Sequence, residues 1–247
     1  MIRRNGPALL FLVLLALAWE AAAVVFRIPH FILPRPSGVL AALWDQRDVL
    51  LKHSVVTLRE ALAGLALSVL FGVTVAAWIH SSKLARRAVY PLVVISQTIP
   101  IVALSPVMVM WFGYTIWSKI AVVILFTFFP VTVNTVDGLR TVDPDLRDLM
   151  KTMGARKRDL FLKLQVPSAL PGFFTGFKMA AAFSVVGATI GEWLGAEAGL
   201  GMFSKRASNM LRAEQVFAAI LLLSVMGLLL FLLAWALEAR LTKRMRR

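Results

Sequence analysis

Six long apolar stretches alternate with shorter polar segments along the chain. The stretches cover approximately residues 7–26, 61–79, 88–112, 120–136, 170–190 and 216–237. At about 1.5 Å of rise per helical residue, such lengths suit the roughly 30 Å hydrocarbon layer of a bilayer. The pattern therefore predicts an all-α, polytopic membrane protein with six transmembrane helices, in which the first stretch is a retained anchor and not a cleaved signal peptide.

The third stretch is the least regular of the six. It contains three prolines, and a polar run lies just before the middle one. Proline within a membrane helix leaves backbone carbonyls without their usual partners, so such breaks tend to face protein or a polar cavity. We therefore expect this stretch to form one wall of a translocation pathway. The candidate lining residues are Ser96, Gln97, Thr98, Pro100, Thr127, Asn134 and Ser184. The alternative is that the small polar side chains simply bond neighbouring helices.

A basic, partly amphipathic segment follows the fourth stretch, at residues 138–167. Its apolar side chains at i, i+3, i+4 and i+7 predict one face of a short helix. They are Leu146, Leu149, Met150 and Met153. Gly154 then permits a sharp change of direction, and the apolar residues 160, 161 and 164 predict a second helical turn that runs to Pro167. The alternative is a helix that lies against lipid headgroups.

Composition excludes an ordinary soluble domain. Hydrophobic residues make up 59% of the chain, charged residues only 16%, and the mean hydropathy is +0.78. The net charge of +14 would by itself suggest a nucleic-acid partner, but the basic residues divide by membrane side. With a cytoplasmic amino terminus, 17 of the 27 Lys and Arg residues fall in cytoplasmic segments and 8 in the opposite ones. This bias predicts that both termini are cytoplasmic.

Residue types suited to catalysis or metal binding are scarce. The chain has no cysteine, its three histidines lack metal-ligand spacing, and no G-x-x-x-x-G-K-[ST] phosphate loop occurs in it. The glycines of GAEAGLG follow a membrane stretch and not a strand, so a tight extracytoplasmic turn explains them better than a dinucleotide site. We expect no catalytic residue, cofactor or metal, and no ATP binding by the chain itself.

Three charged residues near the fifth stretch need separate explanations. Lys178 lies roughly 10 Å along a helix from Pro171, so its side chain is expected to extend to the cytoplasmic surface and to have a structural role. Glu192 and Glu197 fall just beyond the outer end of the stretch. There they would either contact a partner protein or be solvated.

The segment at 138–167 resembles the cytoplasmic "EAA loop" of bacterial ABC importer permeases. In that pattern Glu and two alanines precede a glycine, and an I-x-L-P group follows. Here Asp148, Gly154, Leu164, Val166 and Pro167 occupy the corresponding places. The glycine, the proline and the acid–apolar–apolar order are kept, whereas the acid is Asp and larger apolar side chains replace the alanines.

Longer stretches, in order from about residue 33 to the end, resemble the permeases of the nitrate, taurine and aliphatic sulfonate class of ABC importers, which are binding-protein-dependent transport inner membrane components. They include LPRPSGVLAAL, TIPIVALSPVMVMWFGYTIWSK, FFPVTVNTVDGLRTVDPDL and GEWLGAEAGLG. Within that class, SQTIPIVAL, NTVDGLR and IGEWLGA most resemble the branch associated with thiamine pyrimidine precursors or riboflavin. A sulfonate, taurine or nitrate is the alternative solute.

The resemblance implies a type I ABC importer permease fold in the bacterial inner membrane. The importer would contain two copies of this chain, two cytoplasmic ATPase subunits and an extracytoplasmic substrate-binding protein. The ATPase-coupling residues would be Leu146, Asp148, Leu149, Met150, Met153, Gly154, Arg156, Lys157, Arg158, Leu164 and Pro167. Residues 1–53 would form a membrane helix with an extracytoplasmic connector, and residues 54–247 the permease domain. A solvated charge run is the alternative for residues 156–158.

Two other functional classes are alternatives to an importer permease. A secondary transporter or channel would also have six spans, but such proteins more often carry buried carboxylates or paired broken helices. A membrane-embedded enzyme would need acid, base or metal ligands at one depth. Neither signature is clear in the sequence.

Overall fold

The computed structural model describes residues 2–245, apart from the side chains of residues 2–5, 8, 9 and 243–245. Every regular element in this range is a helix, which confirms the all-α class. The elements are α1 (Ile2–Val25), α2 (Pro36–Asp45), α3 (Arg47–Ser81), α4 (Lys83–Ile95), η1 (Ser96–Thr98), α5 (Ile101–Phe112), α6 (Ile116–Arg140), α7 (Pro144–Thr152), α8 (Lys157–Asp159), η2 (Leu160–Gln165), α9 (Val166–Glu192), α10 (Leu200–Asn209) and α11 (Ala213–Met245).

Among the described residues, four helices are long and apolar enough to cross a bilayer. They are α3, α6, the part Ala213–Thr242 of α11, and the continuous helix Lys157–Glu192, which joins α8, η2 and α9. The pair made by α4 with η1 and by α5 is a fifth candidate, bent by 104°. A shorter apolar helix, Leu10–Val25, lies in α1. Each predicted stretch therefore coincides with a helix, but the third is a broken pair and not one straight span.

Pro100 accounts for the break between α4 and α5. It lacks the N–H that would continue α4, and the preceding residue, Ile99, is extended with ψ 124°, as expected before proline. The hydroxyl groups of Ser96 and Thr98 donate to the carbonyls of Val93 and Ile95 at 2.7 and 2.8 Å. The side chains thus satisfy carbonyls that the interrupted helix leaves free.

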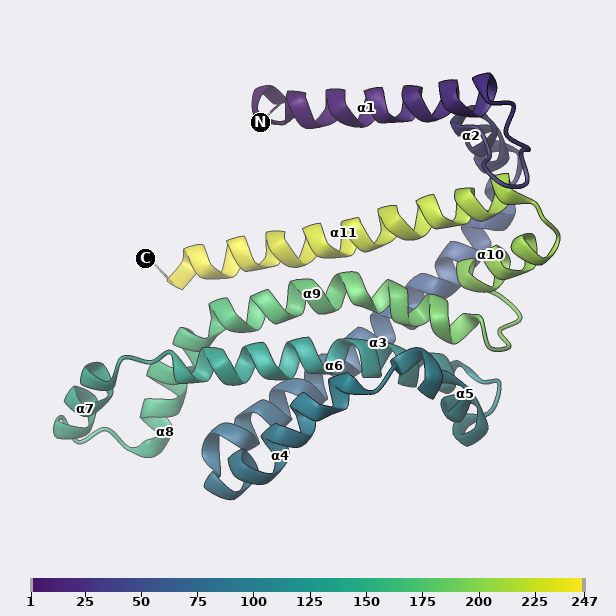
Figure 1. Ribbon diagram of the computed structural model, residues 1–247. Coiled ribbons are helices and arrows are strands. Elements are labelled where there is room, and N and C mark those ends of the chain that lie inside the picture. Colours follow the sequence, from purple (N-terminus) through teal and green to yellow (C-terminus); the bar gives the residue numbers. More distant parts are fainter. Residues whose placement is uncertain (1, 246–247) are drawn as a thin grey trace.

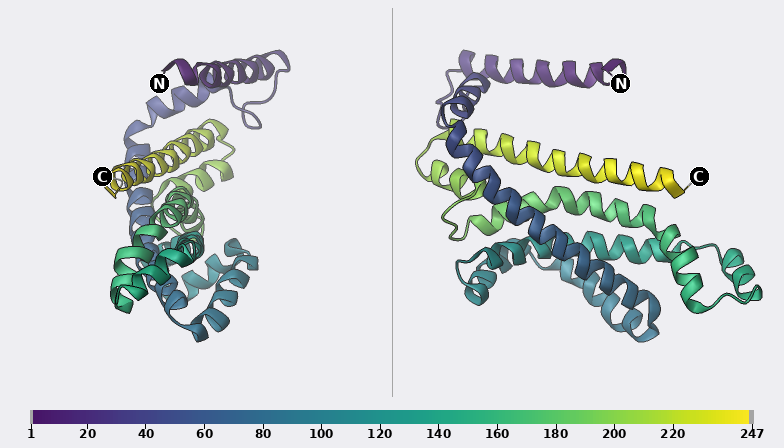
Figure 2. Two further views of the ribbon diagram at one scale, coloured as in Figure 1. Left: turned by 90° about the vertical axis from the view of Figure 1, so that its left-hand side faces the viewer. Right: turned by 180° about the vertical axis from the view of Figure 1, so that it is seen from behind.

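The core consists of α3, α6, α9 and α11. Helices α6, α9 and α11 run side by side, and α3 crosses them obliquely on one face (Figures 1 and 2). Glycines bring α6 and α9 together: a Cβ added at Gly176 would lie 2.2 Å from the Pro130 carbonyl oxygen, and one at Gly172 would lie 2.7 Å from that of Asn134. Such close backbone approach is a main source of helix association in lipid.

Helix α1 contacts the rest of the chain near its C-terminus. The Glu20 carboxylate accepts hydrogen bonds from the backbone N–H and the hydroxyl of Ser37 at 3.0 and 2.8 Å, which ties α1 to α2. The ring of Trp19 lies 5.5 Å from that of Phe217, on α11. The C-terminal part of α1 therefore packs beside α2 and α11.

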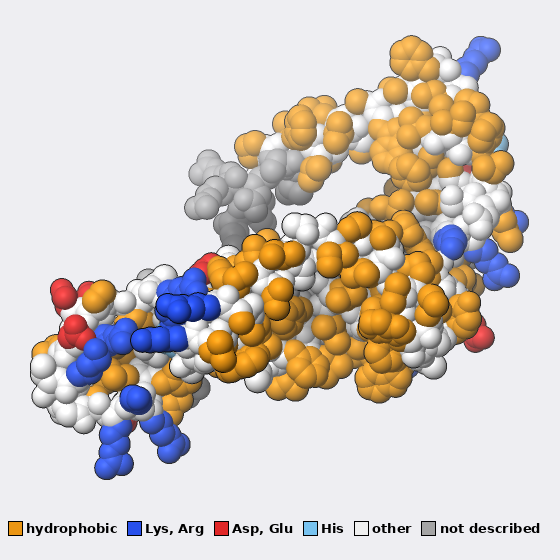
Figure 3. Space-filling view, turned by 60° about the horizontal axis from the view of Figure 1, so that its bottom comes forward, with side chains coloured by type: hydrophobic (Ala, Val, Ile, Leu, Met, Phe, Trp, Pro, Cys, Tyr) orange, Lys and Arg blue, Asp and Glu red, His pale blue; other side chains and the backbone are white. Residues whose placement is uncertain are grey.

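The helices alternate between two ends of the molecule. One end, the α7 end, carries α7, α8, the beginning of α1 and the end of α11, and the other, the α10 end, carries α2, α5 and α10 (Figures 1 and 2). Hydrophobic side chains cover the middle, and Lys and Arg gather over the α7 end (Figure 3). An apolar belt between polar ends is the surface expected of a protein surrounded by lipid.

Candidate functional site

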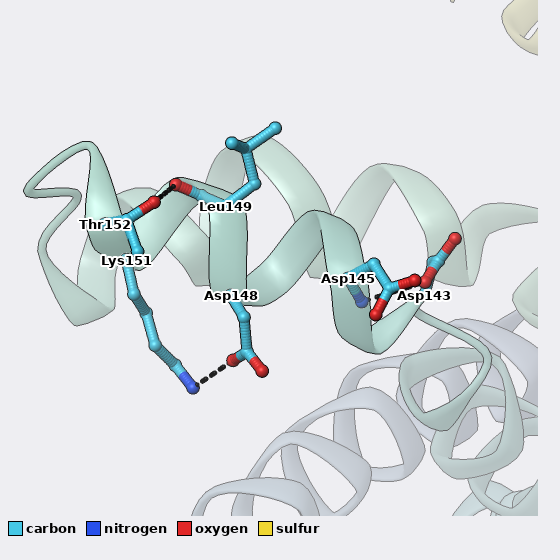
Figure 4. A network of polar contacts seen from close by, with 6 residues as sticks. All are labelled: Asp143, Asp145, Asp148, Leu149, Lys151 and Thr152. Atoms are coloured by element: carbon cyan, nitrogen blue, oxygen red, sulfur yellow. Dashed lines mark hydrogen bonds and ion pairs between the residues drawn. The ribbon is translucent and has the colours of Figure 1, made fainter.

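Helix α7 is a short amphipathic helix at the α7 end, as the sequence predicted. Asp143 caps it by accepting a hydrogen bond from the backbone N–H of Asp145 at 2.9 Å, and Pro144 occupies its first turn. The carboxylate of Asp148 pairs with Lys151 at 2.7 Å. The hydrogen bond and charge of Lys151 hold the pKa of Asp148 below its usual range. Figure 4 shows this pair on one side of the helix and the Leu149 side chain on the opposite side.

The apolar face of α7 is open to its surroundings. The exposed fractions are 50% for Leu146, 56% for Leu149 and 78% for Met153, while Met150 is half-buried. α7 lies beyond the ends of the long helices (Figure 1). Three large apolar side chains exposed on one polar-rimmed helix are typical of a surface that contacts another protein.

Gly154 ends α7 in a Schellman motif. Its φ is +79°, a conformation that glycine adopts at little cost. The N–H of Gly154 donates to the Lys151 carbonyl at 2.9 Å, and that of Ala155 donates to the Met150 carbonyl at 3.0 Å. Apart from Gly154 and its two chain neighbours, no atom of the described residues lies within 4 Å of the position that a Cβ would take. The backbone conformation, and not lack of space, therefore favours glycine here, and the predicted change of direction is confirmed.

The chain after Gly154 leads directly into a long helix. Arg156 is extended and precedes α8, and the basic side chains of residues 156–158 are exposed. The segment η2 is a π-helix, whose wider turn accommodates one extra residue. It leads without a break into α9, which ends at Glu192. Leu164 and Pro167 are half-buried. A hydrogen bond of 3.0 Å between His80 Nε2 and Gln165 Oε1 joins η2 to the end of α3.

The predicted pathway residues fall into two groups. The four at the α4–α5 break, which are Ser96, Gln97, Thr98 and Pro100, are exposed. Thr127 and Ser184 are buried, and their hydroxyl groups donate to the carbonyls of Val123 and Ala181 on their own helices. Asn134 is half-buried, and its amide donates to the Pro130 carbonyl at 2.8 Å. The role of all seven in a pathway stays a prediction. The hydrogen bonds of Thr127, Ser184 and Asn134 stay within their own helices, so they do not join neighbouring helices as the helix-packing alternative expects.

Residues 68–247 match the protein family described as binding-protein-dependent transport system inner membrane component. The chain belongs to this family. The permease is 46% identical over 226 residues to the formylaminopyrimidine transport permease protein ThiX of Halalkalibacterium halodurans, and the match covers 91% of this chain and 90% of ThiX. It is 31% identical over 246 residues to the riboflavin transport system permease protein RibX of Chloroflexus aurantiacus, and the match covers 98% of this chain and 92% of RibX.

The permease fold also matches a solved structure. The methionine ABC transporter MetNI in an inward-facing conformation superposes with a TM-score of 0.70 at 17% identity, and the match covers 79% of this chain and 97% of that chain. The type I importer fold implied by the sequence is thereby confirmed. The permease is a multi-pass membrane component of an ABC importer.

Two predictions about charged residues of the permease were wrong. Lys178 does not extend to the surface but pairs with Glu238 of α11 at 2.7 Å, with about a fifth of each side chain exposed. Only the route to the surface was wrong, since an ion pair between two helices agrees with the structural role expected of Lys178. Glu192 is neither solvated nor available to a partner, because it is 1% exposed. Glu197 is exposed. Both errors have one cause, since the groups that enclose these side chains come from distant parts of the sequence.

Sequence reasoning also missed a polar cluster in the permease at the α10 end. Glu60 is buried on α3, with one carboxyl oxygen that has no partner among the described residues, and it adjoins Glu192. Lys119 is buried at the start of α6, and its ammonium group donates to the carbonyls of Tyr114 and Thr115. The available signal was the position of both groups at the edge of an apolar stretch, where a charge is costly without partners.

Proposed function

We propose that this permease imports a small nitrogen heterocycle, either a thiamine pyrimidine precursor of the formylaminopyrimidine type or a riboflavin-like flavin. The support is the similarity to ThiX and RibX over nine-tenths or more of the chain. Sulfonates, taurine and nitrate are the competing solutes, because permeases named for them are also among the relatives. The chain supplies the path and the coupling, and a separate ATPase supplies the energy.

The assembled importer contains two copies of this chain, two ATPase subunits and an extracytoplasmic binding protein. The exposed apolar face of α7 supports the ATPase contact in this proposal, because it lies beyond the ends of the long helices, where a partner can reach it. The basic residues 156–158 are exposed beside it and provide charged contacts. The ATPases therefore bind at the α7 end, which makes that end and both termini cytoplasmic, in agreement with the distribution of Lys and Arg.

Coupling requires that the ATPases bind α7 differently in the two states of the importer. A partner shifts a two-state equilibrium only by its difference in affinity for the two states. ATP-driven closure of the ATPases would move α7, and the helix Lys157–Glu192 begins directly after the turn at Gly154. The continuous helix Lys157–Glu192 thus transmits a displacement of α7 into the membrane. The bent α4–α5 pair is the candidate wall of the pathway that would then open.

Uptake into vesicles tests the proposed function. The permease is reconstituted with its ATPase and binding protein, and the uptake of a radiolabelled formylaminopyrimidine is measured with ATP inside or outside. We expect uptake only with ATP on the α7 side, competition by the unlabelled compound or by riboflavin, and no competition by taurine or nitrate. A complex whose ATPase cannot hydrolyse ATP is the control. ATP-driven uptake of taurine or a sulfonate, with none of the pyrimidine, would contradict the assignment of the solute.

A further inference from the structure

The N-terminus of α10 is held by side chains of two other helices. The Glu192 carboxylate, at the end of α9, accepts hydrogen bonds from the Thr57 hydroxyl at 2.6 Å and from the backbone N–H of Gly201 at 2.5 Å. The Thr57 oxygen also accepts from the backbone N–H of Leu200 at 2.8 Å. A carboxylate at a helix N-terminus satisfies free N–H groups and interacts favourably with the helix dipole. We call Glu192, Thr57 and these two N–H groups the α10 clamp.

The α10 clamp is packed too closely to adapt to other side chains. Thr57 and Glu192 are 0% and 1% exposed. Gly199 has φ +120°, and a Cβ added to it would lie 2.1 Å from the Glu192 carboxyl carbon. A Cβ at Gly201 would lie 2.6 Å from the Thr189 carbonyl oxygen. Close approach of the backbone of Gly199 and Gly201 to the end of α9 therefore explains these two glycines of GAEAGLG. The contact between α9 and α10 leaves no room for a larger residue at either position.

A groove with both polar and apolar lining lies directly beside the α10 clamp. It has a volume of about 330 Å³, and its charged side chains among the described residues are Arg206 and Arg212, with no carboxylate. His53 lines this groove and also accepts a hydrogen bond from the backbone N–H of Gly199 at 3.0 Å, so the groove and the clamp share a residue. Two arginines in a groove without a described carboxylate fit acidic side chains of a protein partner.

The other end of the same helix lies in the α7 segment. The helix Lys157–Glu192 has 36 residues and is continuous, which corresponds to about 54 Å at the rise of an α-helix. It starts three residues after Gly154 and ends at the clamp. The surface proposed to bind the ATPase and the groove beside α10 are therefore connected by one helix.

We propose that the binding protein places acidic side chains in the groove beside α10, and that the α10 clamp relays this docking to α9. This inference rests on the proposed function, because it needs an ATPase at the α7 end and a binding protein at the α10 end. Glu192 and Thr57 are positioning residues: they contact no solute, and they make α10 move with α9 and α3. Arg206 supplies affinity, and the clamp supplies transmission.

Two measurements on the complete importer in vesicles test the relay. They are the affinity of the solute-loaded binding protein and the factor by which it stimulates ATP hydrolysis. Glu192→Gln should leave the affinity within about twofold of the parental value but lower the stimulation factor at least tenfold, because the amide cannot satisfy Thr57 and Gly201 as the carboxylate does. Thr57→Val, which keeps the side-chain volume and removes the hydroxyl, should do the same. Arg206→Glu should lower the affinity at least tenfold.

Glu197→Gln and Lys52→Glu are the matched controls, because both residues are exposed at the α10 end and neither lines the groove. Both variants should behave as the parent does. Parental stimulation in Glu192→Gln and in Thr57→Val would overturn the relay, and parental affinity in Arg206→Glu would overturn the docking site. If the parental complex itself shows no stimulation, the proposed function fails and the relay fails with it.

Discussion

Lys178 and Glu238 form an ion pair between α9 and α11 that the sequence does not reveal. Their separation along the chain is 60 residues, and only the packing of two helices brings them to 2.7 Å. Glu192 escaped prediction for the same reason, since Thr57 is 135 residues away. Gly154 and the apolar face of α7 were predicted correctly, because the helix period and the conformational freedom of glycine act over a few neighbouring residues.

The pair gives a stability prediction at the residue scale. Lys178→Met alone should destabilise the permease by about 3 kcal/mol, because it leaves the Glu238 carboxylate without its partner in surroundings of low polarity. The double variant Lys178→Met with Glu238→Leu should recover most of the loss. Thermal unfolding in detergent, followed by intrinsic tryptophan fluorescence, measures both. Equal destabilisation by the single and the double variant would show that the pair is not coupled.

At the scale of elements, the helices were predictable and their angles were not. The three prolines of the third stretch predicted an irregular helix, and Pro100 does lie at the break between η1 and α5. The bend of 104° depends on how α4 and α5 pack against the rest of the chain, and no local pattern specifies it. The π-helical turn before α9 likewise has no simple sequence signal. The continuity of Lys157–Glu192, which matters most for coupling, became visible only in the structure.

The α6–α9 contact yields a prediction about helix packing. Gly176→Ala should destabilise the permease by about 1–3 kcal/mol, because the added methyl group would overlap the Pro130 carbonyl oxygen. Gly227→Ala is the matched control in α11, where the nearest atom to an added Cβ is 3.8 Å away. It should be neutral or slightly stabilising, since Ala favours a helix. The same unfolding measurement compares the two, and a Gly176→Ala variant as stable as Gly227→Ala would contradict the close contact.

The break between α4 and α5 gives a prediction about the pathway. If Gln97 lines it, Gln97→Phe should lower ATP-driven uptake several-fold, because a bulky apolar ring would narrow the path, while the ATPase still copurifies with the permease. Met110→Phe, at an exposed apolar position of α5, is the control. Vesicle uptake and copurification measure the two effects separately. Parental uptake in Gln97→Phe would favour the helix-packing role for this polar run.

At the scale of the whole molecule, the alternation of helices between two ends predicts how the permease lies in the membrane. Because the chain has no cysteine, single cysteines report their own side. In intact cells, an impermeant maleimide should label Lys52→Cys, which is exposed at the α10 end, and should not label Lys157→Cys, which is exposed at the α7 end. Permeabilised cells should show both labelled. Labelling of Lys157→Cys in intact cells would show that the α7 end faces the outside, which would contradict the proposed orientation.

Coupling through the α7 segment is the central claim, and stimulated ATP hydrolysis by the reconstituted importer tests it most directly. Gly154→Pro removes the N–H that donates to the Lys151 carbonyl and cannot adopt φ +79°, so α7 should be misdirected away from the ATPase. Gly154→Asn is the control, because Asn tolerates this conformation and the space around the residue is empty. We predict that the loaded binding protein stimulates hydrolysis in the parent and in Gly154→Asn but not in Gly154→Pro. Parental stimulation in Gly154→Pro, with the ATPase bound normally, would contradict coupling through this segment.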